Sequence, residues 1–242
     1  MRKLLIMIVC AGLIFSVTGC GEKAVYSFDD PDICAYVNGE PVYESKMSQY
    51  IDMGKLYWQA EKESLLAQGI GGPPPEDEVE EAYLVLDEHE LDLANEYCGM
   101  DDAQWKKDYY KTLLVKKVFY QSSGFGEDYI SSTIEQYISD IRQSNEIVLA
   151  NGALDAAALI QPVAQKYDLS DEECLDTVLR DFLTRNTERG LLMFSFPGYK
   201  GKRVEFDGEN AQEYIEGVKD VVAQYNTYLD TLMEKAEFVE RP

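Results

Sequence analysis

The spacing of apolar residues predicts a mainly helical protein. In residues 45–68, apolar and aromatic side chains recur every three or four positions, as they do on the buried face of an amphipathic helix. The same period returns in further segments along the chain. Helices are therefore expected at residues 45–68, 76–98 and 101–121, between Gly126 and Asn151, and at 153–167, 170–188 and 210–236.

Polar and helix-breaking residues mark the ends of some of these helices. Ser45 stands at the start of the first apolar run and is expected to cap that helix. Ser170 and Glu173 have the spacing of a capping box, in which a side chain and a backbone amide bond each other reciprocally. The glycines and prolines of residues 69–75 end the first helix.

Two segments favour strands or loops over helix. In residues 33–43, two short apolar runs flank Asn38-Gly39, the strongest short signal for a β-hairpin. Residues 190–210 combine an apolar run with Pro-Gly and Asp-Gly turns, which indicates a short hairpin or an irregular loop. We therefore expect a mainly α fold with a β-hairpin near the N-terminus and a long final helix.

The first twenty residues predict an exported lipoprotein. A basic pair after Met1 precedes the apolar run 4–17, which is shorter than the roughly 20 residues that span a bilayer. The tetrad ending at Cys20 resembles the lipobox of bacterial lipoproteins, whose cysteine carries acyl chains such as palmitate. We expect a signal peptide at 1–19, a tether at 20–31, and attachment to the extracytoplasmic side of the cell membrane through lipid. An uncleaved anchor and an ordinary signal peptide are the alternatives.

Charge and cysteine content narrow the classes of function. The formal net charge is −23 at pH 7, which argues against nucleic-acid binding because that requires a basic surface. After removal of the signal and lipidation, the remaining cysteines allow one disulfide at most, and the sequence leaves its connectivity open. These cysteines are Cys34, Cys98 and Cys174.

No segment predicts a catalytic or metal site. His89 is the only histidine and lies in an acidic run, so neither a histidine-rich zinc site nor a hydrolase with a histidine base is expected. The acidic clusters lack the ligand spacing of a calcium-binding loop, and we interpret them as solvated helix faces. A paired-carboxylate glycosidase stays open only because carboxylates are so numerous. We expect no enzyme activity, no cofactor and no metal.

Three segments, in order along the chain, resemble the PrsA/SurA-type extracytoplasmic chaperones. They are residues 34–45, which contain the Val-Asn-Gly-Glu-Pro turn, residues 98–105 with 110–114, and residues 228–240. The resemblance implies a helical chaperone region like the SurA N-terminal domain at 32–123. It also implies that the C-terminal helix and strand, at 210–242, pack back on that region and leave a helical insert at 124–209.

The insert does not resemble the domain with which members of this family isomerise prolyl bonds. That parvulin domain uses histidines, whereas residues 124–210 contain none and follow a helical pattern. The resemblance therefore implies a chaperone that binds unfolded or newly exported polypeptides without prolyl isomerase catalysis. A structural adaptor lipoprotein that docks one cell-envelope partner is the alternative, and an isomerase with a degenerate domain is a third.

Aromatic residues are the candidates for contact with such polypeptides. Tyr50, Tyr57 and Trp58 share the first expected helix, and Tyr109 belongs to the third. Aromatic rings offer large and adaptable contact areas, so these four are expected to line a groove for polypeptide. For each of them, the alternative is a place in the core with its polar tip near solvent. Neither the identity of the clients nor the oligomeric state follows from the sequence.

Overall fold

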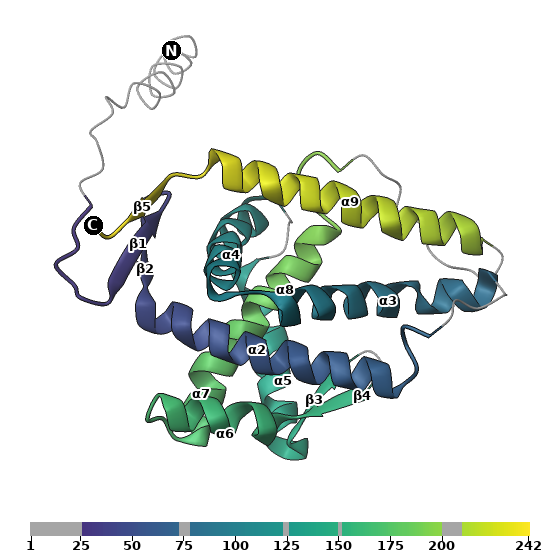
Figure 1. Ribbon diagram of the computed structural model, residues 1–242, viewed down its shortest axis with the longest axis horizontal. Helices are drawn as coiled ribbons and strands as arrows, with labels where there is room; N and C mark the ends of the chain where they lie inside the picture. The colour runs from purple at the N-terminus through teal and green to yellow at the C-terminus, as the bar shows by residue number, and fades with distance from the viewer. Residues whose placement is uncertain (1–25, 73–77, 123–125, 150–151, 200–209) are drawn as a thin grey trace, which may run out of the picture.

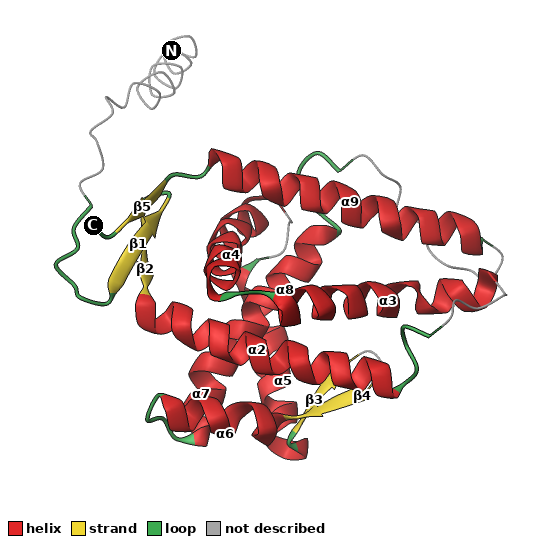
Figure 2. Ribbon diagram, in the orientation of Figure 1, coloured by secondary structure: helices red, strands yellow, loops and turns green. Residues whose placement is uncertain are grey.

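The protein is mainly helical and has a short antiparallel β-hairpin near its N-terminus, as expected (Figure 1). The computed structural model describes residues 26–72, 78–122, 126–149, 152–199 and 210–242. The helices are α2 (Glu44–Ala67), α3 (Glu78–Gly99), α4 (Asp102–Ser122), α5 (Glu127–Ser144), α6 (Ala156–Lys166), α7 (Asp171–Cys174), the π-helical turn η1 (Leu175–Leu179), α8 (Arg180–Met193) and α9 (Ala211–Lys235). The strands are β1 (Ile33–Val37), β2 (Glu40–Tyr43), β3 (Glu146–Leu149), β4 (Gly152–Asp155) and β5 (Phe238–Glu240), as Figure 2 shows.

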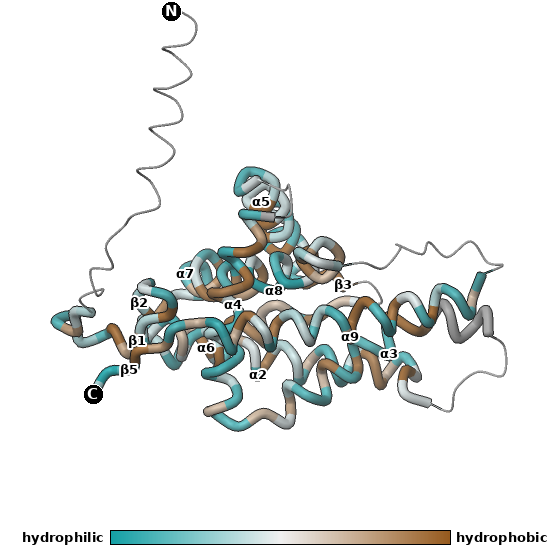
Figure 3. Tube along the Cα trace, turned by 90° about the horizontal axis from the view of Figure 1, so that it is seen from above, coloured by the Kyte–Doolittle hydropathy of each residue, from teal (hydrophilic) through white to brown (hydrophobic). Residues whose placement is uncertain are grey.

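Three long helices form a row, and a second group packs across it. Helix α2 packs against α3, which packs against α9, while α8 packs against both α4 and α5. Seen from above, α5 lies on the opposite side of the molecule from α2, α3 and α9 (Figure 3). The outer ends of α3 and α9 are joined by a small apolar cluster of Val85, Ala211 and Ile215. Residues of the row and of the second group together line a cavity that is described below.

The two ends of the described chain meet in a three-stranded sheet with the order β2-β1-β5. Asn38 and Gly39 take positive φ angles of 51° and 86°, as a tight two-residue hairpin turn requires. Strand β5 pairs antiparallel with β1, and Val239 lies opposite Tyr36. The guanidinium of Arg241 donates hydrogen bonds to backbone carbonyls of the segment before β1. The expected return of the C-terminal helix and strand to the N-terminal region is therefore confirmed.

One apolar cluster joins the expected regions of the chain. It reaches from Ala35 in β1 to Leu229 in α9, and it includes Ile134 and Leu159 of the expected insert. The aromatic side chains at its centre have no exposed surface, and they are Trp105, Phe119 and Phe182. Residues of the expected insert at 124–209 therefore share their core with the chaperone-like region at 32–123.

Helix α2 begins one residue earlier than expected, and Ser45 does not cap it. Tyr43 occupies the N-cap position and makes no capping bond with its side chain. The Ser45 amide donates to Asp32 Oδ1 at 2.9 Å, and the Ser45 hydroxyl donates to Asp32 Oδ2 at 2.5 Å. The Asp32 carboxylate, from the turn before β1, therefore accepts the hydrogen bond of a backbone amide in the first turn of α2. The spacing of residues around Ser45 does not reveal such a distant partner. The capping box of Ser170 and Glu173 is confirmed.

The helix expected between Gly126 and Asn151 ends early, at Ser144. Asn145 takes a left-handed conformation with φ 58°, and the chain continues into the hairpin β3-β4. Val148 belongs to the apolar stripe of the expected helix, but its side chain stands on β3 and is 69% exposed. The apolar spacing was ambiguous here because a short run of isoleucine, valine and leucine suits a strand as well as a helix.

Two further helices differ in length from the expectation. The helix expected at 153–167 begins at Ala156, because β4 occupies the residues before it. The helix expected at 170–188 continues through η1 to Met193. The first residues of the expected loop at 190–210 are therefore helical, and turns follow them. The rest of that loop lies outside the described residues.

None of the described helices has the length and apolar character needed to cross a membrane. The expected signal peptide and Cys20 lie outside the described residues. Cys34, Cys98 and Cys174 are free thiols in the part of the chain that the structure describes. Burial raises the pKa of Cys34 and of Cys174 to about 11, which keeps both thiols protonated at neutral pH.

Candidate functional site

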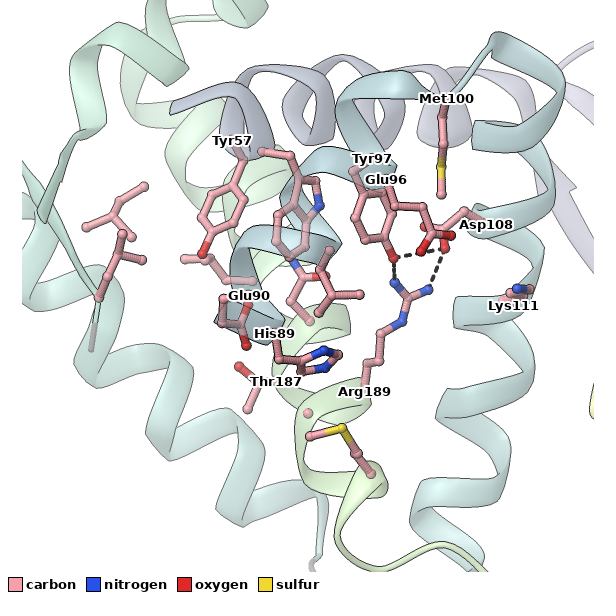
Figure 4. Close-up of a pocket in the computed structure, with 18 of the residues that line it drawn as sticks. Tyr57, His89, Glu90, Glu96, Tyr97, Met100, Asp108, Lys111, Thr187 and Arg189 are labelled. Carbon is pink, nitrogen blue, oxygen red and sulfur yellow. Dashed lines mark hydrogen bonds and ion pairs between the residues drawn. The ribbon is translucent and has the colours of Figure 1, made fainter. Parts of the chain in front are cut away.

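A half-open cavity of about 910 Å³ lies among the helices and is the candidate functional site (Figure 4). Its walls come from α2, α3, α4, α5, α8 and α9, and from strand β3. Pockets that hold ligands typically have volumes of roughly 300–1,000 Å³. The cavity is therefore large enough for a sizeable ligand or for several side chains of another polypeptide.

Apolar and aromatic side chains make up much of the cavity lining. Trp58 of α2 stacks on Tyr97 of α3, with ring centroids 4.5 Å apart and an interplanar angle of 5°. Tyr137 of α5 is 47% exposed and keeps a free surface. Further apolar lining residues are Leu93, Met100, Ile141, Ile147, Leu149, Leu183, Met193, Val222, Tyr225 and Leu229. Such a lining favours ligands that bring apolar surface out of water.

A buried polar network lies at one end of the cavity (Figure 4). Asp108 Oδ1 accepts hydrogen bonds from Arg189 Nη2 at 2.8 Å and from the Tyr97 hydroxyl at 3.1 Å. Asp108 Oδ2 accepts a hydrogen bond from the Tyr50 hydroxyl at 3.0 Å. Arg189 Nη1 also donates to the Tyr97 oxygen. The network joins α2, α3, α4 and α8, so it fixes the positions of four cavity walls.

Arg189 and Tyr97 both keep their protons at neutral pH. Burial lowers the pKa of the Arg189 guanidinium, but the charge of Asp108, together with Tyr97, Tyr50 and Tyr225, outweighs that effect, so the arginine pKa is raised. Burial raises the pKa of Tyr97, so its hydroxyl remains a donor for Asp108 at neutral pH. Arg189 Nε is buried without a hydrogen-bond partner among the described residues. The ion pair is therefore nearly but not completely satisfied.

Acidic groups lie near the other end of the cavity. Glu90 and His89 of α3 and Tyr57 of α2 line it there (Figure 4). Burial raises the pKa of Glu90 and lowers the pKa of His89, so both side chains tend toward their neutral forms. On α2, Glu61 is buried, and one of its carboxyl oxygens has no partner among the described residues. Burial, and secondly the charge of Glu90, raises the pKa of Glu61 to about 7.

Of the four aromatic residues expected to bind polypeptide, two line the cavity and two do not. Tyr57 and Trp58 line the cavity, and their contact with a client stays a prediction. Tyr50 and Tyr109 are only 2% and 3% exposed and do not line it. The guanidinium carbon of Arg185 lies 4.8 Å from the ring centre of Tyr109 and 5.9 Å from that of Tyr50. Both residues therefore lie in the core, and the Tyr50 hydroxyl bonds buried Asp108 instead of reaching solvent.

Sequence reasoning missed the charged pair and the strand at this site. Asp108 and Arg189 are far apart in the sequence, and each stands in a helix with several other charged residues, so no local pattern distinguishes them. Strand β3 was missed because its residues were assigned to the preceding helix. The one usable signal was Asn145, because asparagine tolerates the left-handed conformation that ends many helices.

A second, smaller cavity of about 270 Å³ lies beside α5 and α8. Glu188 lines it, is 1% exposed and accepts a hydrogen bond from the Tyr120 hydroxyl at 2.8 Å. Its other carboxyl oxygen has no partner among the described residues. The volume falls below the range typical of ligand pockets. The larger cavity is therefore the stronger candidate for a polypeptide or other sizeable ligand.

The larger cavity is suited to non-covalent binding of a ligand with mixed character. It offers apolar walls, carboxylates and lysines, together with the carbonyl and amide groups of β3. Within the described residues, no group of three or more histidine, cysteine or acidic side chains has an arrangement that would hold a metal ion. Comparison with known proteins finds no matching family model, no matching curated protein and no matching solved structure.

Proposed function

We propose that this protein is a lipid-anchored extracytoplasmic chaperone that holds unfolded or newly exported polypeptides and does not isomerise prolyl bonds. The half-open apolar cavity carries the proposal, because an unfolded chain exposes apolar side chains that such a cavity can cover. The resemblance of residues 34–45 and 228–240 to PrsA/SurA-type chaperones supports it. The pairing of β5 with β1 agrees with the arrangement that this resemblance implies.

The energetics of the cavity suit weak and reversible binding. Full burial of one leucine, valine or phenylalanine side chain contributes about 1.5–3 kcal/mol. The ordering of an extended client costs roughly 1–2 kcal/mol for each residue that becomes fixed. A few side chains in a cavity of about 910 Å³ therefore give a small net affinity. That is what a chaperone needs if its client is to leave and fold.

Charge and membrane attachment fit the same role. The net charge of −23 favours a well-hydrated protein that repels its own copies, which helps to keep client complexes apart. In this proposal, the lipid on Cys20 supplies membrane attachment close to where exported chains emerge. Two acyl chains hold a protein stably, whereas one holds it only marginally.

An aggregation assay tests the proposal. A chain that begins at residue 21 is mixed with a chemically denatured enzyme that aggregates on dilution, and light scattering is followed. We expect a several-fold molar excess of the chain to delay aggregation. No delay at this excess contradicts the proposal.

A cavity-filling variant shows whether the cavity is responsible. Gly190 lines the cavity, and a Cβ atom added there meets no atom within 4 Å, so Gly190→Trp brings an indole to this wall without a clash at Cβ. Gly99→Trp is the matched control, because Gly99 is equally unobstructed and does not line the cavity. We expect Gly190→Trp to lose the protective effect and Gly99→Trp to keep it. Equal protection by both variants contradicts a role for the cavity.

Affinity capture from membranes distinguishes the chaperone from an adaptor of the same fold. A chaperone yields many clients, each in less than molar proportion. An adaptor lipoprotein yields one dominant envelope partner. A single stoichiometric partner, together with no effect on aggregation, favours the adaptor.

A further inference from the structure

Strand β3 meets the large cavity along its edge and not with one of its faces. All of its residues, Glu146–Leu149, line the cavity, whereas no residue of β4 does. Successive side chains of a strand point to opposite faces. A cavity wall that contains four consecutive strand residues therefore contains the edge of the strand. A free strand edge carries backbone groups with which another strand can pair.

The hydrogen bonds of the hairpin show which backbone groups point outward. The Ala156 amide donates to the Asn145 carbonyl at 3.0 Å, so these two residues form a hydrogen-bonded pair at the base of the hairpin. Bonded and non-bonded pairs alternate along an antiparallel ladder. Glu146 and Val148 therefore direct their amides and carbonyls away from β4. In agreement, the Glu146 amide donates to the Ser144 hydroxyl at 3.1 Å instead of to β4.

The outward amide and carbonyl of Val148 make no hydrogen bond with any residue that the structure describes. The Val148 side chain is 69% exposed, which is the highest exposure among the large apolar residues of the described chain. Ile141 and Tyr137 of α5 line the cavity with β3 and provide an apolar wall beside this edge. An added strand would form hydrogen bonds with these backbone groups and cover the apolar surface beside them.

Charge determines what kind of strand fits. Near β3, the cavity lining includes the carboxylates of Asp140 and Glu146. The Arg189 charge is already paired with Asp108. The remaining lining carboxylates outnumber the lining lysines, and the whole chain is strongly acidic. A basic occupant is therefore favoured over an acidic one.

We propose that the cavity takes an extended polypeptide segment that pairs with the free edge of β3 and carries lysine or arginine beside its apolar residues. Main-chain hydrogen bonds to Val148 and, after displacement of the Ser144 hydroxyl, to Glu146 hold the segment in place. Alternate side chains of the segment enter the apolar cavity, and its basic residues lie against Asp140 and Glu146. This inference rests on the proposed function, and it defines the conformation and charge of the client.

Backbone-methylated peptides test the pairing. The full chain in detergent is titrated against a short fluorescein-labelled peptide of alternating valine and threonine with a lysine at each end, and anisotropy is read. Two further peptides carry N-methyl groups on either the valines or the threonines. Only one of these sets of amides can face β3, so we expect one methylated peptide to bind about tenfold more weakly and the other to bind almost normally. A peptide with glutamate in place of each lysine is expected to bind about tenfold more weakly as well.

A proline substitution tests the same bond from the side of the protein. Val148→Pro removes the outward amide and leaves the hydrogen bonds to β4 intact, because proline is tolerated where a strand's amide faces away from its partner. Ala153→Pro is the matched control, since Ala153 lies opposite Val148 and does not line the cavity. We expect Val148→Pro to weaken binding of the unmethylated peptide about tenfold and Ala153→Pro to leave that binding unchanged. Circular dichroism and thermal unfolding check that both variants fold. If Val148→Pro does not fold, the methylated peptides alone test the strand pairing.

The outcomes separate this inference from the proposed function. Equal binding of both methylated peptides overturns strand pairing, and so does failure of every peptide to bind a chain that still delays client aggregation. In those cases the chaperone function stands without strand pairing. Absence of both peptide binding and aggregation delay overturns the inference and the proposed function together.

Discussion

Asp108 is the residue on which the polar core depends most. It bonds Arg189, Tyr97 and Tyr50 at once, and its side chain is 6% exposed. Asp108→Asn removes the charge that compensates the buried guanidinium. We expect the variant to lose about 3–5 kcal/mol of unfolding free energy, which urea denaturation at pH 7 measures.

An exposed aspartate on the same helix provides the control. Asp102 pairs with Lys55 at 2.7 Å, but its side chain is 89% exposed. Solvent screens such pairs, so Asp102→Asn is expected to change stability little. Similar losses in the two variants would show that the Asp108 network is not a stabilising element of the cavity wall.

Glu61 is expected to make stability depend on pH. Its pKa in the folded chain is about 7, because burial and the charge of Glu90 oppose ionisation, whereas an exposed glutamate has a pKa of about 4.3. The folded state binds the proton more tightly, so its stability is greatest below the unfolded pKa and falls as the pH rises from about 4.3 through about 7. Glu61→Gln removes this loss. We expect the variant to be more stable than the parent by about 1–2 kcal/mol at pH 8, with the advantage decreasing as the pH is lowered toward 5.

Urea unfolding at a series of pH values from 5 to 8 measures this difference. Glu63→Gln is the control, because Glu63 is exposed on the same helix, two residues further on. Its stability relative to the parent is expected to be constant across the series. A pH-independent difference for Glu61→Gln would mean that Glu61 is ionised in the folded chain at all these values.

Between elements, the close approach of α2 to α4 depends on Gly54. A Cβ atom at this position would lie 2.6 Å and 2.7 Å from two ring atoms of Trp105, which has no exposed surface. The Trp105 ring is enclosed by Tyr50 and Tyr97 and cannot move aside without disturbing them. We expect Gly54→Ala to destabilise the protein by about 2–3 kcal/mol in thermal or urea unfolding.

Gly190→Ala is the matched control for this helix contact. Gly190 also lies within a helix, but an added Cβ atom there meets nothing within 4 Å. The alanine lowers the entropic cost of folding the helix, so stability is expected to rise by about 0.5–1 kcal/mol. Destabilisation by both substitutions to the same degree would show that helix propensity, and not contact with Trp105, decides the result.

The elements that the sequence predicts well are those whose signals are local. The period of apolar residues gives α2, α3, α4 and α9 nearly to their ends, and Asn38-Gly39 gives the β1-β2 hairpin. The β3-β4 hairpin was not predicted, because apolar residues such as Ile147 and Val148 fit either period over so few positions. The start of α2 was misread because its partner, Asp32, lies in a turn and not at the cap position.

The whole cavity is harder to predict than any single element. Trp58 and Tyr57 were expected to contact clients, and both do line it. Tyr50 of α2 and Tyr109 of α4 are also aromatic residues of expected helices, yet they are buried against side chains of α8, such as Phe182 and Arg185. Tyr57 packs against Phe182 as well and still lines the cavity. Whether an aromatic side chain lines the cavity or is buried in the core depends on how helices that are distant in the sequence pack together. A single sequence contains no signal for that packing.

At the scale of the molecule in its cell, attachment through Cys20 is the prediction that determines where the cavity works. Cys20→Ala removes the acceptor for lipid, and the described helices offer no membrane-spanning alternative. We expect this variant to leave the membrane fraction and to lose incorporation of a palmitate analogue, while Cys10→Ala, within the expected signal peptide, retains both. Membrane retention of Cys20→Ala would favour an uncleaved N-terminal anchor. The cavity would then still face exported chains, but its distance from the membrane would be determined by polypeptide and not by lipid.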